Sequence, residues 1–282
     1  MNPIGVFDSG YGGLTILRQM RQMLPQYDYL YLGDNARAPY GAHSFEVIYR
    51  YTLQAVEALF RRGCPLVILA CNTASAKALR TIQQNDLPRL DPDKRVLGVI
   101  RPTVEAVGPL TRSRHVGLLA TAGTVNSGSY TMEINKLWPD ITVTGQACPM
   151  WVPLVENYEF DSPGADYFVQ KRVEGILRQD PQIDTLILGC THYPLIAPII
   201  ADLMGHEVAL IDPGRETALA ARDALASAGL LREGRAGTAR YYVSDTTESF
   251  AQLSDWFLGE YAGGPVTRIS VDGYPVEQGA ST

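Results

Sequence analysis

The chain has 282 residues, of which 46% are hydrophobic and 19% charged, a balance typical of a soluble globular protein. This length favours two domains of about 100 to 150 residues each. The net charge of −6 comes without a long acidic or basic run, which argues against a nucleic-acid or anionic-membrane partner and favours a small-molecule substrate.

The first residues, MNPIGVFDSG, lack a basic leader followed by a long apolar stretch, and the apolar run LVILAC from Leu66 is too short to span a bilayer. We therefore expect a cytoplasmic protein with no membrane partner. The four cysteines, at positions 64, 71, 148 and 190, show neither the density of a disulfide scaffold nor the paired spacing of a zinc site. They are predicted to be free thiols, and no metal is expected.

Short runs rich in Val, Ile and Leu alternate along the chain with longer amphipathic stretches, which is typical of a parallel sheet covered by helices. The predicted fold class is therefore α/β. In chain order, strands are predicted at residues 4–8, 27–32, 66–70, 96–100, 115–120, 141–147, 184–189, 208–212, 239–244 and 267–272. Helices are predicted between them at 13–24, 44–62, 74–85, 165–179, 195–204 and 215–228.

The chain also resembles itself. GVFDSGYGGLT near the start is similar to HVGLLATAGTVNS from His115, and LVILACNTA is similar to TLILGCTHY. This repeat predicts two similar domains, related by a pseudo-twofold axis, with a cleft between them. LIDPGRETALAAR from Leu210 resembles the opening once more, so the end of the chain is expected to rejoin the first domain. The predicted division is 1–98 plus 210–282 for the first domain and 99–209 for the second.

A first candidate site lies where the strand at 66–70 ends. Cys71, Asn72 and Thr73 follow it directly and begin the next helix. Ligands of open α/β sheets bind at the carboxyl ends of strands, where helix N-termini offer unpaired N–H groups. The helix end would lower the pKa of the Cys71 thiol, whereas burial would raise it. Taken alone, Cys71 is equally well interpreted as a small buried hydrophobic residue.

The segment LILGCTHYPLI repeats this order of apolar strand, cysteine and polar pair, now with Cys190, Thr191 and His192. If the two halves face each other, Cys71 and Cys190 lie on opposite sides of one cleft, so a shared catalytic role is favoured over two unrelated thiols. Cys64 and Cys148 each precede a proline and have no polar cluster beside them. A structural role is predicted for both.

The first strand runs into DSGYGG, where backbone N–H groups could hold a carboxylate or a phosphate. The segment has neither the lysine of a P-loop nor the spacing of a dinucleotide fingerprint, so no nucleotide site is expected. Asp8, with Ser9 beside it, could meet a substrate ammonium or steady a neighbouring acid or base. Asp8 could instead cap the helix that follows.

Further polar residues are predicted at the same edge of the sheets. Tyr40 and Gly41 follow the second strand, and Thr121 and Thr124 follow the fifth. Donors and acceptors gathered from several such loops suit the zwitterion of an α-amino acid. His192 could tune Cys190 or supply a proton near neutral pH. Glu156 is a weaker candidate for the same supporting role.

Taken together, these motifs resemble glutamate racemases of the aspartate/glutamate racemase superfamily over nearly the whole chain. DSGYGG, PYG, ACNTAS, LATAGTV, CPMWVPLVE, LGCTHYPLI and LIDPG occur in the order of that family. The THY after the second cysteine resembles glutamate racemases, whereas aspartate racemases typically carry TE. The resemblance implies L- or D-glutamate as substrate and D-glutamate for peptidoglycan as product.

The resemblance also implies roles for individual residues. Cys71 would remove the α-proton of D-glutamate and Cys190 that of L-glutamate. Asp8, His192 and Glu156, chosen above from their places beside the motifs, complete the predicted catalytic set. The implied substrate contacts are Asp8, Ser9, Tyr40, Gly41, Asn72, Thr73, Thr121, Thr124, Thr191 and His192.

The chemistry suits two opposed thiols, because the weakly acidic α-hydrogen must leave one face of the amino acid and be replaced on the other. Pyridoxal phosphate would need a Schiff-base lysine, and none of the four lysines, at 77, 94, 136 and 171, falls in a site position. No cofactor is therefore expected.

The alternatives to a glutamate racemase are a racemase of another amino acid such as aspartate, a cysteine hydrolase with His192 as base, or an amino-acid-binding protein. A homodimer is kept open as the assembly.

Overall fold

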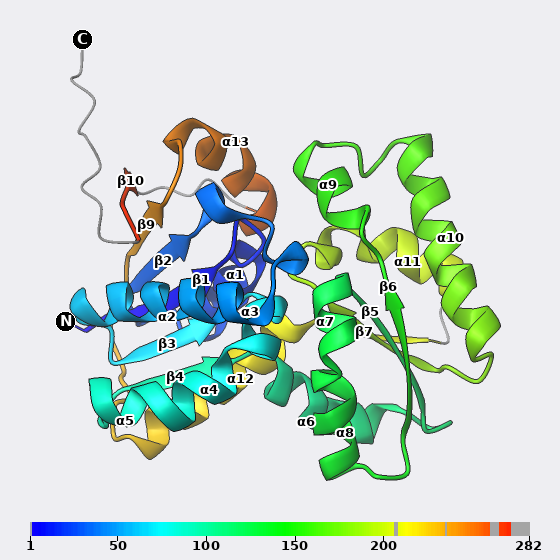
Figure 1. The fold of residues 1–282 in the computed structure, drawn as a ribbon, viewed down its shortest axis with the longest axis horizontal. Coiled ribbons are helices and arrows are strands. Elements are labelled where there is room, and N and C mark those ends of the chain that lie inside the picture. Colours follow the sequence, from blue (N-terminus) through cyan, green and yellow to red (C-terminus); the bar gives the residue numbers. More distant parts are fainter. Residues whose placement is uncertain (1, 206–207, 235, 260–264, 272–282) are drawn as a thin grey trace.

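The computed structural model describes residues 2–205, 208–234, 236–259 and 265–271. Their strands form two separate sheets, in which each strand runs parallel to its neighbours (Figure 1). The six-stranded sheet has the order β10-β9-β2-β1-β3-β4, and the four-stranded sheet has the order β6-β5-β7-β8. The predicted α/β class with parallel sheets is confirmed. We call the part built on the larger sheet the first half and the part built on the smaller sheet the second half.

The strands follow the predicted pattern closely. The larger sheet contains β1 (Ile4–Asp8), β2 (Tyr29–Gly33), β3 (Leu66–Leu69), β4 (Arg95–Gly98), β9 (Ala239–Val243) and β10 (Val266–Arg268). The smaller sheet contains β5 (His115–Ala120), β6 (Thr142–Ala147), β7 (Thr185–Gly189) and β8 (Ala209–Ile211). Each predicted strand overlaps one of these, although residue 272, at the end of the last predicted strand, lies outside the described residues.

Helices connect the strands and cover the sheets. They are α1 (Leu14–Met23), α2 (Phe45–Arg61), α3 (Asn72–Lys77), α4 (Leu79–Thr81), α5 (Leu87–Leu90), α6 (Ile100–Leu110), α7 (Ala122–Ser127), α8 (Ser129–Leu137), α9 (Trp151–Glu156), α10 (Pro163–Gln179), α11 (Ala197–Met204), α12 (Pro213–Ser227) and α13 (Thr247–Leu258). Short 3-10 helices occupy Asn35–Arg37, Tyr40–Ala42 and Tyr193–Ile196, and a π-helical turn occupies Ile82–Asp86.

Two predicted elements end differently in the structure. The strand predicted at 96–100 stops at Gly98, and Ile100 begins α6. The prolines of α6 argue against a helix in the sequence, but Pro102 lies in its first turn, where a missing N–H costs little, and Pro109 lies one residue before its end at Leu110. The helix predicted at 74–85 is divided into α3, α4 and the π-helical turn.

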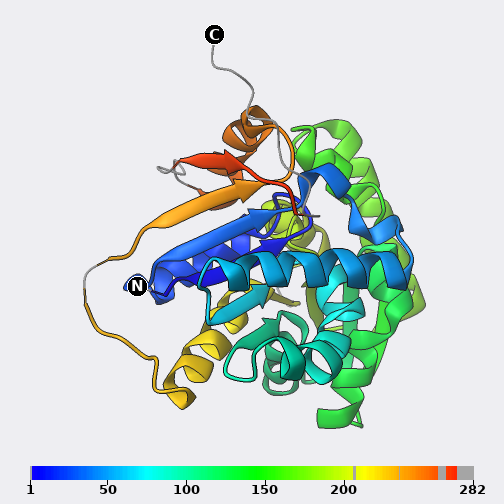
Figure 2. The same ribbon diagram turned by 60° about the vertical axis from the view of Figure 1, so that its left-hand side comes forward.

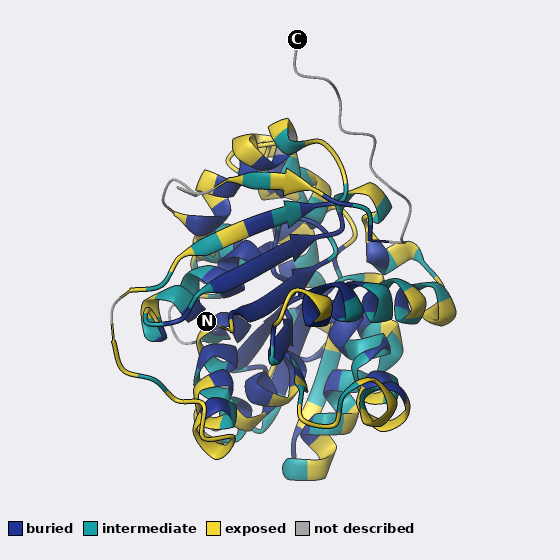
Figure 3. Ribbon diagram, turned by 90° about the vertical axis from the view of Figure 1, so that its left-hand side faces the viewer, coloured by how far each residue is buried: buried dark blue, intermediate teal, exposed yellow. Residues whose placement is uncertain are grey.

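Side chains of the larger sheet alternate between two packed faces, because successive residues of a strand point in opposite directions. Val6 belongs to the same buried cluster as Leu17 of α1, whereas Phe7 belongs to the cluster that includes Val56 of α2. Both faces are therefore covered, and Figure 3 shows the central strands buried while the outer sides of the helices are exposed. A fully buried Val, Leu or Phe contributes roughly 1.5–3 kcal/mol through loss of water contact.

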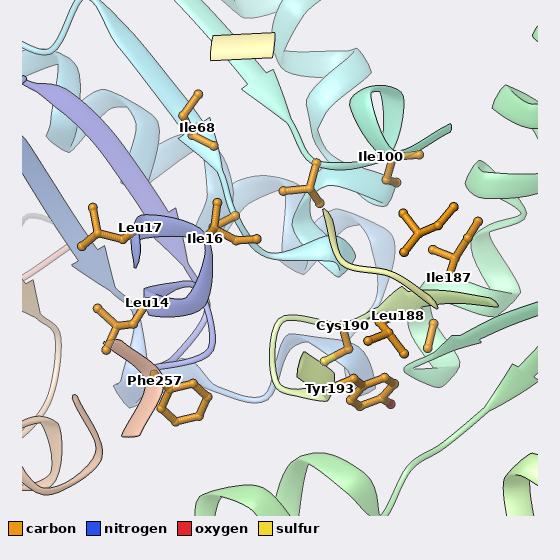
Figure 4. Packing of buried hydrophobic residues seen from close by; sticks show 14 of the residues in the cluster. Leu14, Ile16, Leu17, Ile68, Ile100, Ile187, Leu188, Cys190, Tyr193 and Phe257 are labelled. Atoms are coloured by element: carbon orange, nitrogen blue, oxygen red, sulfur yellow. The ribbon is translucent and has the colours of Figure 1, made fainter. Parts of the chain in front are cut away.

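The two halves share a continuous core. One cluster of buried residues joins Ile16 of α1 to Leu188 of β7 and to Cys190 just after it, and Figure 4 shows these three side chains. After α12, which packs on α1 and α6, the chain returns to the larger sheet as β9 (Figure 2). Among the helices that the structure describes, none is long and apolar enough to cross a membrane.

Candidate active site

Cys71 and Cys190 occupy equivalent places in the two halves. Cys71 follows β3 at the start of α3, and Cys190 follows β7 just before the 3-10 helix at Tyr193–Ile196. Both are nearly buried, with 6% and 7% of their surface exposed. One cavity, with a volume of about 40 Å³, is lined by both cysteines. The other described residues that line it are Ser9, Gly10, Ala38, Pro39, Tyr40, Gly41, Asn72, Thr73, Thr121, Val152, Glu156, Thr191 and His192.

Cys71 has neutral hydrogen-bond partners and an acidic neighbour. Its sulfur accepts from the backbone N–H of Ala74 at 3.4 Å and lies 3.4 Å from the hydroxyl oxygen of Ser9. Burial, reinforced by the nearby carboxyl group of Asp8, raises the pKa of Cys71 to about 12, although the Ser9 and Ala74 hydrogen bonds oppose that rise. The sequence left two opposing effects open for this thiol, and burial outweighs the end of the six-residue helix α3.

Cys190 instead lies beside a histidine that is hydrogen-bonded to a glutamate. Nδ1 of His192 lies 3.8 Å from the Cys190 sulfur, and Nε2 lies 2.9 Å from a carboxylate oxygen of Glu156. Burial alone would lower the pKa of His192, but the hydrogen bonds with Cys190 and Glu156 outweigh it and raise the pKa to about 10. The imidazole is therefore protonated near neutral pH and places a positive charge beside the Cys190 sulfur.

Asp8 ends β1 behind Ser9 and does not line the cavity itself. Its carboxylate accepts from the N–H of Gly10 at 2.9 Å and interacts with the N–H of Gly13. The sequence predicted that these glycine N–H groups could bind a ligand. In the structure they instead donate to the carboxylate of Asp8. The cap of α1 is Gly13, without a side-chain hydrogen bond, so Asp8 is not the helix cap. Burial raises the pKa of Asp8, although the charge of His192 opposes this.

The glycines of DSGYGG allow the first half to touch the Cys190 motif. A Cβ atom on Gly12 would lie 2.2 Å from Oγ1 of Thr191 and 2.5 Å from Nδ1 of His192, distances at which atoms cannot coexist. The hydroxyl of Thr15 also donates to the backbone oxygen of Thr191 at 3.0 Å. The loop after β1 is thus fitted directly against the second half.

Three threonines from both halves form a group of hydroxyls beside the cavity. Oγ1 of Thr73 lies 3.1 Å from that of Thr121 and 3.3 Å from that of Thr124. Thr124 donates its backbone N–H to Thr121 and lies behind the cavity wall, whereas Thr73 and Thr121 line it. The hydroxyl of Tyr40 donates to Asp34. Tyr40 therefore lines the cavity with its other atoms.

The sequence missed two residues that hold this site in place. Buried Asp34 accepts from Tyr40, Arg37 and Ser244, and thereby ties the loop that carries Tyr40 to the larger sheet. Tyr130 of α8 donates to the side chain of Asn72 at 2.7 Å. Asp34 follows a strand and could have been noticed for that reason, but nothing around Tyr130 in the sequence indicates a contact 58 residues away.

Two other expectations concern residues outside the cavity. Cys64 and Cys148 are buried free thiols that do not line it. Lys77 ends α3 and donates to the backbone oxygen of His43.

In the described part of the chain, no group of three or more His, Cys, Asp and Glu side chains is arranged to hold a metal ion.

Comparisons with known proteins place this geometry in context. Residues 4–221 match the family described as Asp/Glu/Hydantoin racemase. The glutamate racemase of Geobacter metallireducens is 40% identical over 271 residues, which cover 95% of this chain and 97% of that protein. The glutamate racemase of Streptococcus gordonii is 39% identical over 92% of this chain and 95% of that protein.

Solved structures are similar in fold as well. A glutamate racemase isoform of Bacillus anthracis matches with a TM-score of 0.87 and 32% identity, covering 94% of this chain and 97% of that one. The glutamate racemase of Francisella tularensis, solved in complex with D-glutamate, matches with a TM-score of 0.87 and 33% identity, covering 97% and 99% of the two chains.

Proposed function

Because the chain belongs to the Asp/Glu/Hydantoin racemase family and catalyses the interconversion of L- and D-glutamate, we propose that Cys71 and Cys190 are its acid and base. The observation that carries this proposal is that both thiols line one cavity, each after a central strand of a different sheet. The D-glutamate that is formed supplies the synthesis of bacterial peptidoglycan.

The proposed reaction needs no cofactor, because the two thiols exchange a proton across the substrate. One cysteine, as thiolate, removes the α-proton from one face while the other, as thiol, donates a proton to the opposite face. Cys190 acts as base on L-glutamate and Cys71 acts as base on D-glutamate. After each turnover the two sulfurs have exchanged protonation states, so they titrate as one coupled unit.

The positive charge of His192 favours proton removal by Cys190. An imidazolium 3.8 Å from the Cys190 sulfur stabilises a thiolate there, and Glu156 keeps the ring charged and oriented. On the other side, burial and the nearby carboxyl group of Asp8 raise the pKa of Cys71 and so favour its thiol form.

The polar residues around the thiols suit a zwitterionic substrate. The side-chain amide of Asn72 and the hydroxyls of Thr73, Thr121 and Thr191 offer donors to its carboxylates and to the charge that develops during proton removal. The hydroxyl of Ser9 can accept from the ammonium group, with the carboxyl group of Asp8 behind it. Tyr40 and Gly41 form a further part of the wall.

We also propose the predicted division into two domains, 1–98 with 210–282 and 99–209, with the site between them. The assignment of β9 and β10 to the larger sheet supports this division. Because β8 pairs with β7 and extends to Ile211, the second boundary fits best after that residue. A cytoplasmic location completes the proposal and follows from the sequence interpretation alone, which leaves a homodimer open as the assembly.

The decisive test is the isotopic content of product formed early in D₂O. If one thiolate removes the proton and the opposite thiol returns another from solvent, the first D-glutamate formed from L-glutamate carries α-deuterium while unreacted L-glutamate carries little. Proton NMR of the separated enantiomers measures both. Early product that keeps a substantial share of its original α-hydrogen would contradict two opposed groups.

A second measurement tests substrate and cofactor. Purified protein without any addition should interconvert the glutamate enantiomers, followed by circular dichroism, and act poorly on aspartate. Activity that appears only after addition of pyridoxal phosphate, or a preference for aspartate, would refute the assignment.

A further inference from the structure

Tyr130 makes the most specific contact with the site that the proposed chemistry leaves unused. It lies on α8 in the second half and is completely buried. Its hydroxyl donates to Oδ1 of Asn72 at 2.7 Å, and Asn72 belongs to α3 in the first half. This hydrogen bond therefore joins the two halves directly behind Cys71.

The contact leaves one end of the Asn72 amide for another partner. Asn72 is 3% exposed and lines the cavity, and among the described residues its Nδ2 group has no hydrogen-bond partner. A buried donor without a partner costs free energy unless something in the site accepts from it. With Oδ1 held by Tyr130, the N–H groups of Nδ2 are the part of this side chain left to meet a substrate.

The orientation of this amide decides whether it attracts or repels a carboxylate. The terminal torsion of asparagine has broad, roughly twofold preferences, so a 180° turn that exchanges oxygen for nitrogen meets little intrinsic resistance. The Tyr130 hydroxyl opposes that turn, because it donates to Oδ1 and also has a hydrogen bond with Thr103, so that accepting from Nδ2 would require it to rearrange. Burial keeps the pKa of Tyr130 well above its usual range, so the hydroxyl stays protonated.

We propose that Tyr130 is a positioning residue of the racemase, which fixes the Asn72 amide so that Nδ2 donates to a carboxylate of the bound amino acid. This inference rests on the proposed function and adds to it a residue that touches no reacting atom. Because the hydrogen bond crosses between the halves, the amide is correctly oriented only when the halves are together around the substrate.

The test begins with Tyr130→Phe, which removes only the hydroxyl. The unheld amide can then turn its oxygen toward the carboxylate, so kcat/KM for glutamate should fall about tenfold to a hundredfold, as expected for loss of one buried hydrogen bond. Since the two enantiomers have equal free energy, kcat/KM falls equally in both directions. The distribution of the loss between kcat and KM should follow that of Asn72→Ala.

Tyr29→Phe is the matched control. Tyr29 is also nearly fully buried, and its hydroxyl donates to the backbone oxygens of Met20 and Leu24, away from the cavity. Both phenylalanine variants should lose similar thermal stability, but only Tyr130→Phe should lose activity. Equal activity of the two variants would overturn the proposal.

A double-mutant cycle separates positioning from a general structural effect. In an Asn72→Ala background, Tyr130→Phe should change kcat/KM by less than twofold, because the amide it positions is gone. Calorimetric binding of D-glutamate to each variant gives the same cycle where turnover is too slow to measure. Independent, multiplying losses would refute the inference even if wild-type racemisation and its isotopic signature confirm the proposed function.

Discussion

The surroundings of Cys71 and Cys190 differ sharply although the backbone around them is alike. Each cysteine follows a central parallel strand, precedes a short helical segment and lines the same cavity. Cys71 is surrounded by a hydroxyl, a backbone N–H and a buried carboxyl group, whereas Cys190 faces a histidine paired with Glu156. The repeated motif thus fixes the positions of the two thiols, while residues that differ between its two copies, together with Glu156, set the charge around each thiol.

The strongest test of this comparison removes one thiol at a time. Cys71→Ser and Cys190→Ser should each lower racemisation by roughly a thousandfold or more, because a hydroxyl is a far weaker acid than a thiol. The variants should differ in what remains. In D₂O, Cys71→Ser keeps the base for L-glutamate and should exchange only the α-proton of L-glutamate, whereas Cys190→Ser should exchange only that of D-glutamate.

NMR of each enantiomer separately measures this exchange. Exchange of both enantiomers by a single variant would show that one thiol reaches both faces of the substrate. Near-normal racemisation by either variant would remove that cysteine from the reaction.

A smaller effect is expected from the charge on the Cys190 side. The pKa of His192 is raised to about 10 from an ordinary 6.5, so the protonated ring is favoured in the folded protein. This stabilisation is fully present below about pH 6.5 and is lost as the pH rises through about 10. Glu156→Gln removes one cause of the raised pKa and should move the basic limb of kcat/KM about one unit lower.

Glu159→Gln provides the control for this shift, because it removes the same charge from an exposed position three residues away. Its pH profile should match that of the wild type. An unchanged basic limb in Glu156→Gln would show that Glu156 does not set the charge of His192.

The smallest effects are expected at the other two thiols. Cys64→Ala and Cys148→Ala should retain most of the activity, because both side chains are buried away from the cavity. Each should lose about 1 kcal/mol of stability from lost packing, measurable by denaturant unfolding. A thousandfold fall in turnover with intact folding, for either variant, would mean that the wrong pair of thiols has been assigned.

The sequence predicts the fold and the two thiols well for a physical reason. Buried parallel strands appear as apolar runs, and residues just after them collect at one edge of the sheet, as Cys71 and Cys190 do. Contacts between distant segments leave no such pattern. The hydrogen bond from Tyr130 to Asn72 depends on how the halves meet, whereas those from Ser244 to Asp34 and between Glu156 and His192 join distant segments within one half.

Segment ends were also less predictable than segment types. VLGVI is continuous in hydrophobicity, so the sequence alone does not mark Gly98 as the end of β4. The structure shows only that no larger residue fits at this end, because a Cβ on Gly98 would lie 2.7 Å from a Leu79 methyl group and 2.8 Å from the Ser75 hydroxyl.

The close fit of Gly12 against Thr191 and His192 also limits how this protein can evolve. The halves resemble each other, yet the position that would hold a Cβ on residue 12 is already filled by two side chains of the other half. Replacing Thr191 by a smaller residue would not free position 12, because His192 lies there as well. Residues 12, 191 and 192 are therefore expected to be retained together. An alignment of chains with this motif should show glycine at 12 wherever threonine and histidine follow the second cysteine.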